Sequence, residues 1–152
     1  MAILYRRRPM SQLLLAGLLA GCGDDGGSSG NPGGERPQLN GPITYERGGG
    51  IAGRRDRLTV QPDGSASLTT NTGTRAITLS SAELRALADE LEQTDQTALP
   101  AKSTSPTPIA DAFNYRVVHE GKTVDTDQEA MPDELSPLVA ELGGLVDRHG
   151  TR

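Results

Sequence analysis

A glycine-rich stretch flanked by arginines is the part of this sequence best suited to bind a partner. Its glycines leave the backbone open to close contact, and guanidinium groups pair readily with carboxylates. One isoleucine within it could fill an apolar pocket of a partner. The candidate partner-binding residues are Arg47, Gly48, Gly49, Gly50, Ile51, Ala52, Gly53, Arg54 and Arg55, and Arg57 follows just beyond them.

The residues of this glycine-rich stretch also have a purely structural interpretation. The glycines could serve only the backbone geometry of a hairpin connection, with the arginines on a solvated surface. Phosphate binding is excluded, because the spacing fits neither the P-loop nor the dinucleotide-binding fingerprint. The residues alone favour turn geometry over partner binding.

Residue groupings typical of catalysis or metal binding do not occur in the sequence. The histidines, His119 and His149, have no partners at the spacing of a metal site or a general base, and we expect both at the surface. The alternating acids Asp125, Asp127 and Glu129 lack the turn glycine and the final glutamate of a calcium loop. The serines and threonines have no nucleophile elbow. We therefore expect no enzyme activity, no cofactor and no metal.

The start of the chain has the features of a bacterial export signal. Three arginines at positions 6 to 8 precede an apolar run over 13–20, which is too short to cross a membrane. The run ends in Leu19-Ala20-Gly21-Cys22, which resembles a lipobox, and Cys22 is the single cysteine. We predict a lipoprotein signal over 1–21 and a lipid on Cys22 that anchors the protein outside the cytoplasm, in the cell envelope. An ordinary secretory signal is the alternative.

The segment after Cys22 is predicted to be a tether. Residues 23–40 are mostly Gly, Ser, Asp, Pro and Asn, which bury too little apolar surface to offset the entropy of ordering. We therefore divide the chain into the signal at 1–21, a lipidated cysteine with a disordered tether at 22–40, and one folded domain at 41–150.

Charge excludes one class of partner. Without the three arginines of the signal, the 15 basic residues fall to 12, against 20 acidic residues. A body this acidic lacks the basic surface that neutralises phosphates, so we expect no nucleic-acid partner. We expect the domain to be a monomer.

Hydrophobic periodicity predicts an α+β domain. Alternating apolar residues and turn signals predict four to six short antiparallel strands, over 43–47, 58–60, 65–70 and 75–78 and in a hairpin at 113–126. A capping box at Ser80 and Glu83 predicts a helix that ends near residue 93. A second helix is predicted to begin at Met131-Pro132. The order strands, helix, hairpin, helix suggests two amphipathic helices packed on one face of the sheet, with a surface loop over 95–108.

The order of several short motifs resembles the emfourin family, which inhibits protealysin-like, thermolysin-type metalloproteases. The resemblance covers about residues 43 to 148. It rests on the first strand with the glycine stretch (43–53), the helix that begins at Ser80, the segment Asp111-Ala112-Phe113-Asn114-Tyr115, and the segment from Met131 to Leu138.

This resemblance implies a lipid-anchored inhibitor that occupies the cleft of a thermolysin-type metalloprotease without chemistry of its own. The predicted signal, lipid and tether would remove a free N-terminus from the possible means of inhibition. A binding module in the envelope that does not inhibit is the alternative.

Overall fold

Strand β1 (Ile43–Gly49) is the centre of the fold, with a paired strand on each side. The computed structural model describes residues 37–107 and 109–151. Strand β1 pairs antiparallel with β2 (Arg54–Val60) along one edge and with β6 (Phe113–His119) along the other. The glycine stretch is therefore the connection between two neighbouring central strands.

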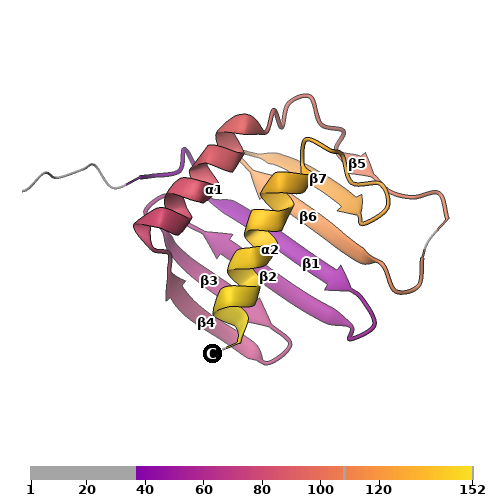
Figure 1. The fold of residues 1–152 in the computed structure, drawn as a ribbon, viewed down its shortest axis with the longest axis horizontal. Coiled ribbons are helices and arrows are strands. Elements are labelled where there is room, and N and C mark those ends of the chain that lie inside the picture. Colours follow the sequence, from indigo (N-terminus) through magenta and orange to yellow (C-terminus); the bar gives the residue numbers. More distant parts are fainter. Residues whose placement is uncertain (1–36, 108, 152) are drawn as a thin grey trace, which may run out of the picture. The chain divides into compact units, whose positions relative to one another are not determined.

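The remaining strands extend the sheet in both directions from this centre (Figure 1). On one side, β3 (Ser65–Thr70) and β4 (Gly73–Thr78) continue the antiparallel meander from β2. On the other side, β7 (Lys122–Asp127) pairs antiparallel with β6, and the short β5 (Lys102–Ser103) pairs parallel with β7. The spatial order is β4-β3-β2-β1-β6-β7-β5.

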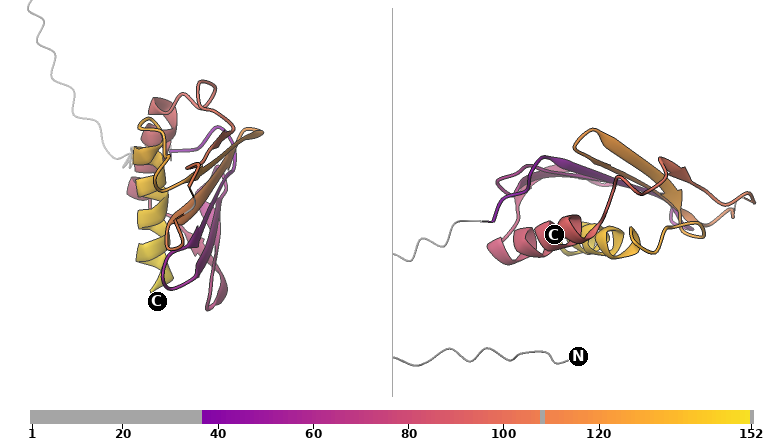
Figure 2. Two further views of the ribbon diagram at one scale, coloured as in Figure 1. Left: turned by 90° about the vertical axis from the view of Figure 1, so that its right-hand side faces the viewer. Right: turned by 90° about the horizontal axis from the view of Figure 1, so that it is seen from above.

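Both helices cover the same face of the sheet, as Figure 2 shows from the side. They are α1 (Ser81–Gln93) and α2 (Ser136–Gly150), and the core lies between them and the strands. The other face carries no helix. Gly143 of α2 faces the sheet, where a Cβ would make an ordinary contact of 3.4 Å with the hydroxyl of Tyr45.

The α+β class is confirmed, but the predicted strand number, purely antiparallel sheet and element order are wrong. The sheet has seven strands, and β5, inside the predicted surface loop, makes it mixed. The loop is held at several points: Leu99 is buried, the Asp125 N–H donates to the Ala101 carbonyl at 2.9 Å, and the Ser105 N–H donates to Asp127 at 2.6 Å. These contacts are not encoded in a local pattern.

The last helix begins four residues or more after its predicted start. A helix from Met131-Pro132 would need an N–H at Pro137, and proline has none. The helix instead begins at Ser136, so that Pro137 falls in its first turn, where the missing N–H is not needed.

The predicted tether is too long at its C-terminal end. Leu39 is 6% exposed within the core, and its N–H donates to the Pro62 carbonyl at 3.1 Å. The last residues assigned to the tether are therefore part of the domain. The predicted signal and Cys22 lie outside the described residues.

A charged cluster links the start of α1 to the end of α2. The predicted capping box is confirmed: the Ser80 N–H donates to the Glu83 carboxylate at 2.9 Å, and the Glu83 N–H donates to the Ser80 hydroxyl at 3.3 Å. The same carboxylate lies 3.0 Å from His149 Nε2 and 3.4 Å from Arg148 Nε. Burial alone would raise the pKa of Glu83, but the Ser80 hydrogen bonds and His149 lower it to about 2.

We predict that Glu83→Gln destabilises the domain in a pH-dependent manner. The pKa of Glu83 is about 2 in the fold and 4.5 ordinarily, so its ionised form stabilises the fold above pH 4.5, and this contribution is lost as the pH falls towards 2. Glutamine keeps the capping box but not the charge. Thermal unfolding should show a loss of about 1 kcal/mol at pH 7 that shrinks below pH 4.5.

Glu92→Gln is the matched control, because Glu92 is an exposed residue of the same helix. A difference between wild type and Glu83→Gln that stayed constant from pH 7 to pH 2 would contradict this role for the charge.

Candidate functional site

Arg47, predicted as a surface residue for binding, lies beneath α2. Its side chain is only 10% exposed and points to the helix-covered face, like Ile43 and Tyr45 before it in β1. Its Nε and Nη2 donate to one oxygen of Asp56 at 3.0 and 2.8 Å, and Nη2 also donates to Asp147 at 2.8 Å. Most of this guanidinium is therefore used inside the domain.

The two carboxylates keep Arg47 charged although it is largely buried. Burial opposes the charged form, but hydrogen bonds from the guanidinium to Asp147 and Asp56 outweigh it and raise the pKa of Arg47. The hydrogen bond from Arg47 in turn lowers the pKa of Asp147. Arg54 joins the cluster, with its Nη1 3.1 Å from Asp147. The base of the glycine-rich connection between β1 and β2, called the glycine loop below, is thus tied to α2 by four charged groups.

An aromatic cluster continues from Arg47 along the same face of the sheet. The Arg47 guanidinium lies 5.8 Å from the centre of the Phe113 ring, a cation–π distance. Phe113 lies 6.2 Å from Tyr115, which stacks at 6.3 Å on Tyr45. Burial raises the pKa of Tyr45, so it stays neutral. The aromatic side chains of β6 thus support the loop between β1 and β2.

Two glycines of the stretch are required by this packing. Gly49 and Gly50 have positive φ angles, 101° and 71°, which glycine adopts most easily. A Cβ on Gly49 would lie 2.5 Å from the Ala112 carbonyl oxygen, and one on Gly50 would lie 2.6 Å from the Phe113 ring. Gly53 also has a positive φ, 56°, but no atom lies near its missing Cβ.

The loop that connects β1 to β2 is held on both sides. The Gly50 N–H donates to the Ala112 carbonyl at 3.4 Å, which joins the loop to the start of β6. From the β3–β4 turn, the Asn71 amide donates to the Gly53 carbonyl at 3.1 Å and accepts the Arg55 N–H at 2.8 Å. The glycine loop is therefore anchored by its neighbours, despite its composition.

The tip of this loop exposes apolar surface. Ile51 is 92% exposed, and Ala52 beside it is also exposed. Ile109, which is 52% exposed, lies in the turn that ends at Ala112, next to the loop. Among the described residues these two isoleucines are the exposed large hydrophobic side chains. Sequence reasoning missed Ile109, although an isolated isoleucine in a Thr- and Pro-rich segment was a signal.

The arginines of β2 are divided between the two faces of the sheet. Arg54 lies towards α2 with Asp56, whereas Arg55 and Arg57 are exposed on the face that carries no helix. Arg57 is 3.5 Å from Glu46 across the β1–β2 pair. The structure therefore does not bring the predicted binding arginines together as one patch.

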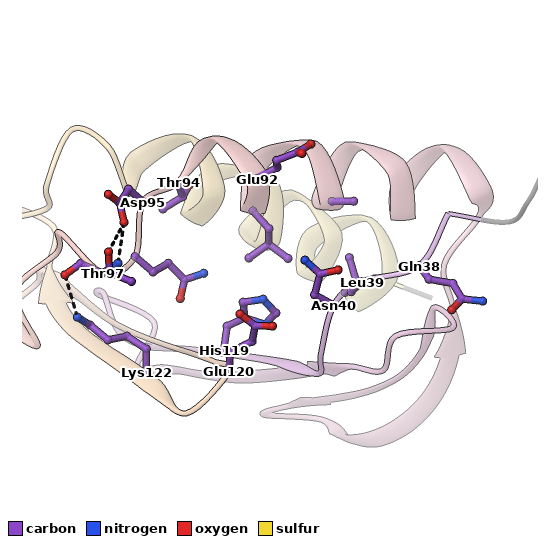
Figure 3. Close-up of a pocket in the computed structure, with 13 residues that line it drawn as sticks. Gln38, Leu39, Asn40, Glu92, Thr94, Asp95, Thr97, His119, Glu120 and Lys122 are labelled. Atoms are coloured by element: carbon purple, nitrogen blue, oxygen red, sulfur yellow. Dashed lines mark hydrogen bonds between the residues drawn. The ribbon is translucent and has the colours of Figure 1, made fainter.

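A pocket of about 570 Å³ lies at the opposite end of β1, between α1, the β6–β7 turn and residues 38–40 (Figure 3). His119 lies on it but is buried, which corrects the expected exposure, and its Nδ1 is 3.3 Å from the Pro42 carbonyl. Lys122 Nζ donates to the Thr97 carbonyl at 3.5 Å. These groups are paired within the fold, and none of the predicted site residues is nearby.

Groups that could hold a metal are not found in the described part of the chain. No three or more His, Cys, Asp or Glu side chains converge there. Asp125 instead pairs with Arg116 at 2.6 Å, and Asp127 accepts backbone N–H groups of Ser105, Glu129 and Ala130. Within residues 37–107 and 109–151, no helix has the length and apolar character to cross a membrane.

We predict that Arg47→Met destabilises the domain by about 3 kcal/mol. The substitution keeps an apolar stem but leaves the carboxylate of Asp56, which is 6% exposed, without its main partner. Urea unfolding measures the effect. Arg57→Met is the control on the uncovered face and should change stability by about 0.5 kcal/mol or less; an equal loss for both would contradict the structural role of Arg47.

We also predict different costs for alanine at the loop glycines. Gly49→Ala and Gly50→Ala should each destabilise the domain by about 2 kcal/mol or more, because they combine positive φ with a steric clash. Gly53→Ala has the positive φ without the clash and should cost about 1 kcal/mol. Thermal unfolding of the three variants measures the order, and equal costs would contradict it.

Comparison with known proteins finds no family model and no curated protein that matches this chain.

Proposed function

We propose that the protein is a membrane-anchored inhibitor of a thermolysin-type metalloprotease, and that it blocks the protease cleft with the tip of its glycine loop. The observation that supports this most strongly is the position of Ile51 and Ile109. Both are exposed, and they lie in two neighbouring connections at the same end of β1, which are joined by the hydrogen bond from the Gly50 N–H to the Ala112 carbonyl. Exposed apolar side chains at one site are typical of protein-binding surfaces.

Rigidity of the loop supports inhibition by occlusion. A loop that is already held in its bound conformation loses little entropy on binding. Asn71 on one side and Ala112 on the other hold the backbone around Ile51, and Phe113 packs against Gly50. A segment held in this way also resists the bending and stretching that cleavage in a protease site requires.

The arginines near the loop could pair with acidic residues around the protease cleft. Arg54 is half-exposed beside Asp147, and Arg55 is exposed on the other face of β2. Charged groups around an apolar centre mainly increase the association rate and the specificity. Ile51 would thus supply affinity, and the arginines would orient the approach.

Inhibition in this form needs no chemistry from the protein. The domain would occupy the cleft reversibly, as a folded surface. The lipid predicted on Cys22, which lies outside the described residues, would keep the inhibitor at the envelope. There it would meet exported proteases.

We predict that Ile51→Asp abolishes most of the inhibition without unfolding the domain. The side chain is 92% exposed, so stability should change by about 0.5 kcal/mol or less. Loss of a central apolar contact typically costs at least 2 kcal/mol of binding, so the inhibition constant for thermolysin should rise by about 30-fold or more. Inhibition is measured with the full chain and a peptide substrate.

Ala82→Asp is the matched control, because it introduces the same charge at an exposed residue in the first turn of α1. It should leave inhibition unchanged. If the wild-type protein at micromolar concentration leaves thermolysin-type proteases from the same cell fully active, the proposal is wrong. Capture of such a protease without inhibition would favour the non-inhibitory binding module.

A further inference from the structure

Gly48 differs from the glycines that follow it, because the fold does not require a glycine there. Its φ is not in the positive region, and the nearest atom to its missing Cβ is the Arg54 carbonyl oxygen at 3.8 Å, an ordinary contact distance. Glycine within a strand costs about 0.5–1 kcal/mol relative to alanine. It often marks a place where another molecule approaches the backbone.

Because Gly48 has no side chain, its backbone forms the floor of a hollow on the sheet face that carries no helix. Side chains alternate between the two faces along β1, and that of Arg47, just before Gly48, points towards α2 and Phe113, so position 48 faces the uncovered side. In register with Gly48 are Arg55 on β2 and Asn114 on β6. The hollow has a volume of about 550 Å³ and is bordered by these three residues.

A row of charges crosses the sheet beside this floor. Glu46 lies in register between Arg57 and Arg116, and Arg116 faces Asp125 on β7. Two ion pairs are formed, Arg57 with Glu46 at 3.5 Å and Arg116 with Asp125 at 2.6 Å.

Arg47 and Asp56 also border the hollow, but they pair with each other. The other charged residues around it are three arginines and two acids, namely Arg55, Arg57, Arg116, Glu46 and Asp125. Each carboxylate is engaged by its own arginine, so one positive charge is left in excess. It belongs to Arg55, directly beside the floor at Gly48.

We infer that this hollow binds a carboxylate side chain of an acidic protein segment. Arg55 can donate two parallel N–H groups to a carboxylate, and Asn114 offers an amide donor on the other side of the floor. With no Cβ at Gly48, the carboxylate can approach the backbone between them. Arg57 and Arg116 add attraction from the neighbouring row.

An acidic protein fits this face better than an anionic membrane. The arginines of the hollow alternate with Glu46 and Asp125 and do not form a continuous basic patch. Such alternation favours a partner whose carboxylates are spaced to match the arginines over a uniformly negative surface. This surface shares Arg55 with the loop surface described above, but binding of an acidic segment here does not require inhibition of a protease.

Fluorescence anisotropy of a dye-labelled hexaglutamate peptide with the full chain tests the inference. Wild-type protein should bind it, and the affinity should fall about tenfold in Arg55→Ala and in Gly48→Val, which fills the floor. Gly48→Val should remain folded, because valine is favourable in a strand and the nearest atom to a Cβ at this position, the Arg54 carbonyl oxygen, is 3.8 Å away. Thermal unfolding of each variant checks this point.

Two substitutions serve as controls. Arg85→Ala removes an exposed arginine from α1, and Ser67→Val adds a valine on the same sheet face in β3. Both should bind the peptide as the wild type does.

Three results would overturn the inference. They are equal binding of a hexaglutamine peptide, unchanged binding in Gly48→Val, or preferential binding to anionic over zwitterionic vesicles that Gly48→Val abolishes. The last result would assign the hollow to a membrane surface. Each of these measurements is independent of inhibition of thermolysin.

Discussion

The buried ion pairs of Arg47 are the interaction on which the loop end of this domain depends. A guanidinium removed from water is unfavourable unless it is fully paired. Asp56 comes from the neighbouring strand and Asp147 from a helix 100 positions further along the chain, so both pairs form only in the complete fold. Their geometry fixes β1, β2 and α2 relative to one another. The glycine loop therefore projects from a base that is held by charge as well as by apolar packing.

Elements with strong local signals could be predicted from the sequence. The capping box at Ser80 and the alternation over Ser65–Thr70 both encode structure within a few residues, and both elements lie where predicted. Strand β5 could not be predicted, because its two residues pair only through contacts with β7 and residues around Asp127. Helix α2 begins later than predicted because Pro137 is favourable only in the first turn of a helix, so the helix starts at Ser136 and not at Pro132.

The glycine stretch was identifiable as special, but its glycines could not be told apart by sequence. At Gly49 and Gly50 a side chain is excluded by Ala112 and Phe113, which are more than 60 positions away in the sequence. Gly48 has no such constraint. In the sequence the three glycines form one motif. In the fold, Gly49 and Gly50 shape the loop, whereas Gly48 leaves space for a hollow. A motif of identical residues thus combines two physical functions, and only the partner atoms reveal which is which.

Strand alternation explains why the arginines do not act as one basic patch. Side chains point to opposite faces at successive positions, so neighbouring Arg54 and Arg55 face α2 and the uncovered surface respectively. The same period places Arg47 in line with Ile43 and Tyr45, a signal of burial that was present in the sequence. Arginines of the covered face neutralise carboxylates and stabilise the loop. Those of the uncovered face remain exposed, so the specificity for the acidic partner that we propose could change there without loss of the fold.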